Sequence, residues 1–125
     1  MNIDLFPLDF MLPPKYQVVR AKQYDSMNRA LHIQLLEGGE KFSMPTGMTA
    51  ELRIKRPDGS RLSKASTLNY ENDASKILAE FPEHSFDQPG MLRAGIVIKS
   101  GDEVRSTSLF WVLVEPALVD HSAEV

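Results

Sequence analysis

The sequence predicts an all-β protein in which two antiparallel sheets pack face to face, with seven or eight strands behind an apolar N-terminal arm. Short runs of residues alternate between apolar and polar, as in 30–35 and 50–55. A period of two is typical of a strand, because successive side chains point to opposite faces of a sheet. The runs stop at turns rich in Gly, Pro, Asn or Asp, most clearly at Pro57-Asp58-Gly59.

The first element, residues 1–14, is an arm that combines many large apolar side chains with three prolines. The prolines exclude a regular helix or a central strand, because proline lacks the backbone N–H that both need. An arm this apolar is expected to dock, either on its own domain or on another subunit, since exposed apolar surface usually marks an interface. Its anchors would be Phe6, Phe10 and Leu12, because aromatic and large apolar residues dominate interface centres.

The predicted strands follow the arm in order, each bounded by a polar turn. They cover residues 16–22, 29–36, 49–56, 61–68, 76–81, 90–99 and 103–115, and residues 41–48 form either a short edge strand or a loop. The strand domain therefore spans residues 15–116, and residues 117–125 form a C-terminal tail. We expect an immunoglobulin-like β-sandwich, with an SH3-like or OB-like barrel as the alternative. Leu109, Trp111 and Leu113 are predicted to face the core from the last strand.

The composition is that of a single globular domain of 125 residues, which is long enough to bury a core without disulfides or metals. Cysteine is absent, so disulfides, thiolate metal sites and cysteine nucleophiles are excluded. A net charge of −3 argues against nonspecific binding to nucleic acid, which needs a cationic surface. The sequence has no apolar run long enough to span a membrane and no basic start typical of a signal peptide, so we expect synthesis in the cytoplasm.

No motif in the sequence indicates catalysis or a cofactor. The three histidines, His32, His84 and His121, lie on a strand, a loop and the tail, whereas metal ligands must converge. Most carboxylates fall in turns, where they hydrogen-bond the local backbone. The serines lack a nucleophile-elbow context, and no glycine-rich loop suits a phosphate. The sequence therefore predicts a non-enzymatic protein without a metal or cofactor.

A basic hairpin around Pro57-Asp58-Gly59 is a candidate contact surface. Its cations are Arg53, Lys55, Arg56, Arg61 and Lys64, of which Arg53 and Lys55 share one face by the period of two. One interpretation is a solvated sheet face whose charges protect an edge. The other is an electrostatic contact between Arg53, Lys55 and an acidic neighbour in an assembly.

Four stretches of the chain, followed by a closing apolar strand, resemble a known family. They are the strand of residues 19–25, the strand and turn of residues 29–39, the segment 47–59 that contains Leu-Arg-Ile-Lys-Arg-Pro-Asp-Gly, and the segment 88–94 that begins with Gln88-Pro89-Gly90. In this order they resemble the N-terminal domain of baseplate upper proteins, from tailed phages and prophages of Gram-positive bacteria, over roughly residues 15–115.

The resemblance implies a structural component made in the host cytoplasm and built into the virion tail baseplate. It would dock to neighbouring tail proteins and to copies of itself, as a homo-oligomer. The net charge and the lack of a membrane-spanning run predict no nucleic-acid or membrane partner. The family pattern continues into a linker and receptor-binding parts, so this chain is expected to be either a piece of a longer protein or a short stand-alone tail component. The alternative function is a carbohydrate-binding or adhesin-type sandwich module, which needs exposed aromatic residues.

Overall fold

The computed structural model describes residues 6–11, 18–24, 30–107 and 109–117. These residues form ten strands and one turn of 3-10 helix. The elements are β1 (Phe6–Asp9), β2 (Val18–Lys22), β3 (Ala30–Glu37), β4 (Glu40–Lys41), β5 (Thr49–Lys55), β6 (Arg61–Ala65), η1 (Tyr70–Asn72), β7 (Lys76–Glu80), β8 (Gly90–Ser100), β9 (Glu103–Ser106) and β10 (Phe110–Glu115). Within this described part, no helix has the length and apolar character needed to cross a membrane.

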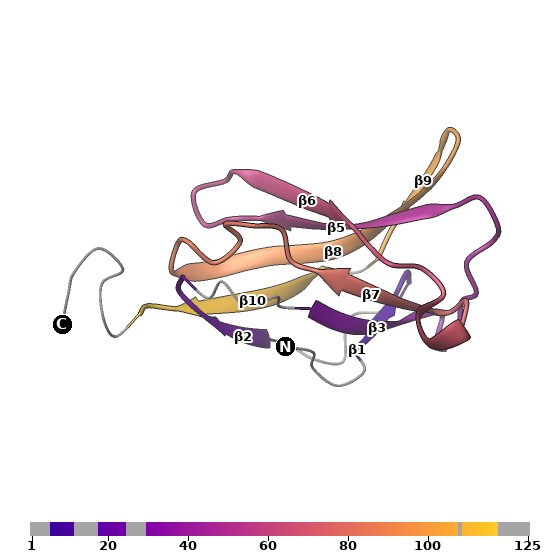
Figure 1. The fold of residues 1–125 in the computed structure, drawn as a ribbon, viewed down its shortest axis with the longest axis horizontal. Coiled ribbons are helices and arrows are strands. Elements are labelled where there is room, and N and C mark those ends of the chain that lie inside the picture. The colour runs from indigo at the N-terminus through magenta and orange to yellow at the C-terminus, as the bar shows by residue number, and fades with distance from the viewer. Residues whose placement is uncertain (1–5, 12–17, 25–29, 108, 118–125) are drawn as a thin grey trace.

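The strands form two sheets that lie one over the other as a sandwich (Figure 1). The four-stranded sheet contains β1, β3, β4 and β7, with β1 at one edge beside β3. The six-stranded sheet has the order β2-β10-β8-β5-β6, and β9 pairs with the far end of β8. The predicted β-sandwich is therefore confirmed over the barrel alternative.

The predicted antiparallel pairing is wrong at two places, and both sheets are mixed. β1 runs parallel to β3, with Phe6 opposite Ile33. β2 likewise runs parallel to β10, with Val19 opposite Val112. A parallel pair needs a long crossover connection, so its partners are far apart in sequence, and alternation within either strand does not reveal the direction of its partner.

Part of the predicted arm is a strand of the sandwich itself. Pro7 lies in β1, and β1 is an edge strand, which is where a residue without an N–H is tolerated. Phe6 and Leu8, on either side of Pro7, are 2% and 0% exposed. These residues therefore dock on their own domain in this structure.

The core lies between the two sheets and uses the alternate positions that the period of two predicts. Its fully buried large side chains are Leu8, Leu31, Ile33, Leu35 and Ile77 from the four-stranded sheet, and Leu52, Leu92, Ile96, Ile98, Phe110, Val112 and Val114 from the other. Within β3, Leu31, Ile33 and Leu35 thus face the core at every second position, as alternation predicts.

The last strand shows the opposite side-chain orientation from the prediction. Leu109 and Trp111 are 56% and 40% exposed, and Phe110 is the buried residue at 1%. β9 pairs Ser106 with Val97, whereas β10 pairs Phe110 with Ala94, so the chain advances by one residue more than β8 does between these two pairs. This extra residue is a β-bulge, and a shift of one residue moves every following side chain to the other face.

Candidate functional site

The predicted basic residues Arg53 and Lys55 lie on the outer face of the six-stranded sheet, where both are exposed. Pairing across the strands places Lys55 directly opposite Arg61 of β6 and opposite Arg93 of β8. We call these three residues, Arg61, Lys55 and Arg93, the cationic row. Arg93 in turn stands opposite Trp111 of β10, with its guanidinium 5.0 Å from the centre of the indole ring. Adjacent strands are about 4.8 Å apart, so the cationic row places one positive charge on each of the three neighbouring strands at this spacing.

A groove of about 530 Å³ opens on this outer face, between the hairpin of β5 and β6 and the segment that leads into β10. Its lining combines the cationic row and Arg53 with the exposed side chain of Leu109. Gly95 also lines it, and a residue without a side chain lets another chain or a ligand approach the sheet backbone.

Some cations of the groove are paired with a carboxylate and others are not. Glu51 receives a hydrogen bond from Arg53 Nε at 2.6 Å and lies 3.7 Å from Lys99 Nζ. The hydrogen bond from Arg53, aided by the charges of Arg53 and Lys99, lowers the pKa of Glu51 against the opposing effect of its burial. Lys55 and Arg61, in contrast, have no carboxylate within ion-pair distance among the described residues. Like charges directly opposite each other destabilise a sheet, so an anionic partner would stabilise this face.

The arm residues occupy two environments. The ring of Phe6 is inside the sandwich, 4.9 Å from the ring of Phe110 in the other sheet. Phe10 is half-buried and makes an edge contact with Phe42, while the guanidinium of Arg105 lies 4.7 Å from the Phe10 ring centre. Leu12 lies outside the described residues. The role of these residues in binding another subunit stays a prediction.

A buried carboxylate fixes the end of β1. Asp9 is 4% exposed and accepts hydrogen bonds from the backbone N–H groups of Met11, Gly38 and Gly39, at 2.7, 3.0 and 2.7 Å. The turn between β3 and β4 is thereby tied to the arm, because both glycines belong to that turn. Arg105 adds a link between the sheets through an ion pair with Glu37 at 2.8 Å.

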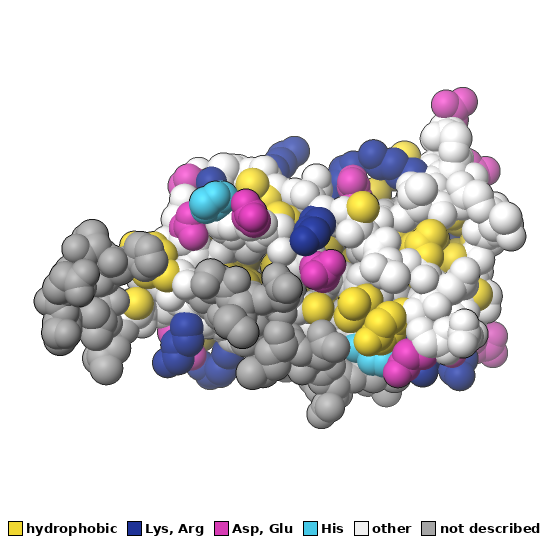
Figure 2. Space-filling view, viewed as in Figure 1, with side chains coloured by type: hydrophobic (Ala, Val, Ile, Leu, Met, Phe, Trp, Pro, Cys, Tyr) yellow, Lys and Arg dark blue, Asp and Glu magenta, His cyan; other side chains and the backbone are white. Residues whose placement is uncertain are grey.

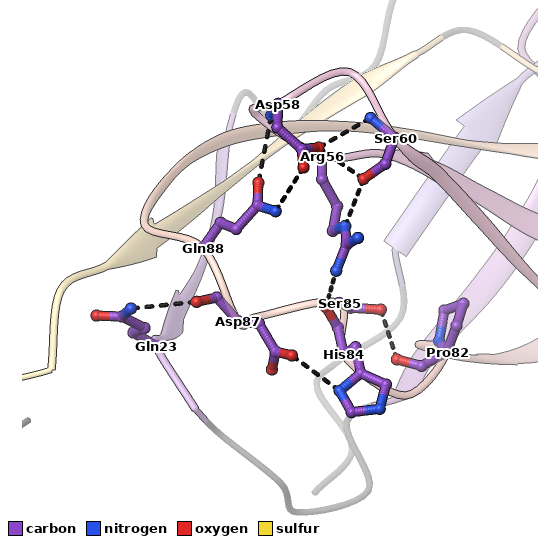
Figure 3. Close-up of polar contacts among 9 residues, drawn as sticks. All are labelled: Gln23, Arg56, Asp58, Ser60, Pro82, His84, Ser85, Asp87 and Gln88. Atoms are coloured by element: carbon purple, nitrogen blue, oxygen red, sulfur yellow. Dashed lines mark hydrogen bonds and ion pairs between the residues drawn. The ribbon is translucent and has the colours of Figure 1, made fainter. Parts of the chain in front are cut away.

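The two most specific sequence signatures meet at the opposite end of the sandwich (Figure 3). The side-chain amide of Gln88 donates to Asp58 Oδ2 at 2.8 Å, and the backbone N–H of Asp58 donates to Gln88 Oε1 at 3.2 Å. Gly90 has φ +126°, and a Cβ there would lie 3.1 Å from the ring of Pro57. The Arg-Pro-Asp-Gly turn and the Gln-Pro-Gly segment are therefore two halves of one contact.

Hydrogen bonds lower the pKa of Asp58 in this contact. The hydroxyl of Ser60, then its backbone N–H, and then the Gln88 amide hold the pKa of Asp58 at about 2, below its usual value of 3.8. Arg56 extends the network by donating to Ser60 Oγ at 2.7 Å and to the carbonyl of His84 at 3.1 Å.

The same network reaches the end of the last strand. Gln23 donates to the carbonyl of Asp87 at 3.1 Å and accepts from the backbone N–H of Ala117, also at 3.1 Å. Four segments far apart in sequence are thus joined where β10 ends. This arrangement gives the signatures a structural role, which is to fix the end of the domain from which the chain continues.

Comparison with known proteins identifies the fold. The BppU N-terminal domain family, which comprises the N-terminal domains of baseplate upper proteins, matches residues 8–125. The chain belongs to this family. A solved structure described as the N-terminal domain of phage TP901-1 ORF48 has a TM-score of 0.70 and 16% sequence identity, over 92% of this chain and 99% of that chain. At this sequence identity the likeness shows a shared fold. A search of curated proteins finds no match.

Membership of the BppU N-terminal domain family indicates a structural component of a phage tail, as the resemblance of the sequence implied.

Within the described residues, no group of three or more His, Asp or Glu side chains is arranged to hold a metal ion. The ring of His32 makes an edge contact with Tyr70, with the two ring centres 4.6 Å apart.

Sequence reasoning missed the partners of Arg93 and Gln88 and the orientation of Trp111. Arg93 and Gln88 act through partners about 30 or more residues away in sequence, and no local pattern reports such a pairing. Trp111 was assigned to the wrong face. The only local signal for it is the polar stretch 105–108, which interrupts the apolar run and is where the bulge begins.

Proposed function

We propose that this domain is a non-catalytic assembly module of a phage tail baseplate, which docks through its β-sandwich to neighbouring tail proteins. The observation that carries the proposal is the family match over residues 8–125. The structure supports it in two ways. Hydrogen bonds join distant segments at both ends of the sandwich, and one sheet face carries Lys55 and Arg61, which have no ion-pair partner among the described residues. A domain with one cationic face can bind a neighbouring protein that carries a complementary acidic surface.

The docking surface in this proposal is the outer face of the six-stranded sheet, where Arg53 and Lys55 are exposed. In this proposal the arm stabilises its own domain, because the Phe6 ring is buried in the core. The chain would be made in the host cytoplasm and incorporated into the virion tail there.

The experiment is to locate the chain in assembled particles. Virions carrying an epitope tag on this protein are purified on a density gradient, treated with nuclease, and examined by immunogold electron microscopy. We expect gold at the distal end of the tail and a constant ratio of this chain to the other tail proteins by quantitative mass spectrometry. Label absent from intact virions, or present only on the capsid, would contradict the proposal.

Carbohydrate binding remains a second candidate because Trp111 is 40% exposed beside Arg93, contrary to the sequence prediction. Exposed aromatic rings next to polar groups are the usual platform for a sugar. This alternative predicts saturable binding on a glycan array that is lost in Trp111→Ala. Equal signals from the wild type and this variant would exclude it.

A further inference from the structure

The hairpin between β8 and β9 is the part of the six-stranded sheet that extends furthest from the sandwich. Figure 1 shows it projecting beyond the two layers, and Figure 2 shows acidic side chains at its tip. The tip residues Asp102 and Glu103 are exposed, and Val104 beside them is 57% exposed. Gly101, with φ +57°, permits the tight turn between the strands.

The groove on the outer face is complementary to this tip in charge and in apolar character. The cationic row holds three like charges in direct cross-strand register, an arrangement that favours an acidic occupant. The exposed Leu109 in the groove offers an apolar contact for a side chain such as Val104. Both surfaces are presented by one chain at different places on the same sheet.

We propose that the groove of one copy of this chain binds the acidic tip of the β8–β9 hairpin, Asp102 and Glu103, of a second copy. This inference rests on the proposed assembly role and names one of its partners. Asp102 and Glu103 of one copy would pair with Lys55 and Arg61 of the next, and Val104 would pack on Leu109. A contact between two different surfaces is heterologous, so it propagates from copy to copy and closes into a ring when the rotation allows.

Charge reversal tests this proposal. One variant carries Lys55→Glu and Arg61→Glu in the groove, and a second carries Asp102→Lys and Glu103→Lys in the hairpin. Sedimentation equilibrium of the wild type, at up to about 1 mM protein to detect weak contacts, should give masses above the 14.1 kDa monomer. The mass should fall with salt, because exposed ion pairs are screened.

Each reversed variant alone should be monomeric, since its groove and hairpin carry the same sign of charge. An equimolar mixture of the two should associate again, because each groove then meets an oppositely charged hairpin. The fluorescence of Trp111, the only tryptophan and a neighbour of Arg93, provides a second readout of groove occupancy. A matched control carries Lys22→Glu and Lys41→Glu, two exposed lysines off the groove with the same change in net charge. This control should associate like the wild type.

A wild type that stays monomeric at every concentration would overturn the inference, as would a mixture that fails to associate. Association that persists in both reversed variants would also overturn it, because another surface would then be responsible. A monomeric protein that is nevertheless found at the tail tip would leave the proposed function standing. The two proposals therefore fail separately.

Discussion

Replacing Phe6 with Ala tests whether the arm is part of this domain in solution. The Phe6 ring is 2% exposed and packs against Phe110 of the opposite sheet, with ring centres 4.9 Å apart. The substitution removes apolar surface from the core and leaves a cavity that the fixed strands around it cannot fill. Substitutions of buried Phe by Ala cost about 3–5 kcal/mol in the free energy of unfolding.

This cost is large for a domain of this length. Unfolding entropy is about 2.1 cal/mol/K per residue, so each kcal/mol shifts the melting temperature by about 4 °C in a chain of 125 residues. Phe6→Ala should therefore lower the Tm by about 10–20 °C. The exposed Met11, 69% accessible on the same arm, is the control, and Met11→Ala should change stability by less than about 0.5 kcal/mol.

Urea unfolding followed by the Trp111 fluorescence and by far-UV circular dichroism measures both variants. The loss in Phe6→Ala should be independent of protein concentration, because the arm docks on its own chain. A loss below about 1 kcal/mol would refute the reasoning, since it would mean that the arm leaves the core in solution. A loss that grows on dilution would instead indicate that the arm is exchanged between chains.

Three further predictions follow from the same structure. Phe110→Ala should destabilise the domain by about 3–5 kcal/mol, whereas Trp111→Ala should cost under about 1 kcal/mol; the reverse order in urea unfolding would contradict the bulge. NMR titration of Asp58 should give a midpoint of about 2. Because this folded-state pKa lies below 3.8, the contribution of Asp58 to stability is present above pH 3.8 and is lost as the pH falls through about 2. A titration midpoint at the usual value of 3.8 would show that the contact between Asp58 and Gln88 does not form. Gly90→Ala should cost about 1–3 kcal/mol, because φ +126° is strained for any residue with a Cβ; an unchanged Tm would contradict that backbone conformation.

Local pattern was sufficient for the strands and turns, because both depend on neighbouring residues. Alternation at 50–55 corresponds to β5, and Pro57-Asp58-Gly59 is the turn that ends it. Residues 41–48, predicted to form either a short edge strand or a loop, are strand only where β4 ends at Lys41, and the rest is loop and turn. The predicted strand 103–115 divides into β9 and β10, since a bulge has no simple signature in a run of apolar residues.

The candidate site was predicted only in part. Arg53 and Lys55 were recognised as one face because they are two residues apart, but the cationic row depends on pairing with β6 and β8. The arm was recognised as a docking element from its composition. Composition could not decide whether Phe6 binds its own core or another chain, because an apolar ring is stabilised by either.

The sequence by itself determined that this chain is an all-β sandwich without an evident catalytic motif, and the order of its turns indicated its family. Periodicity and turn chemistry depend on neighbouring residues, so they can be read from the sequence without knowing which strands pair. Only the tertiary structure decided which strands run parallel, which face Trp111 occupies, and that Asp58 meets Gln88. These features depend on register between segments distant in sequence, and a shift of a single residue in that register exchanges the core face for the surface.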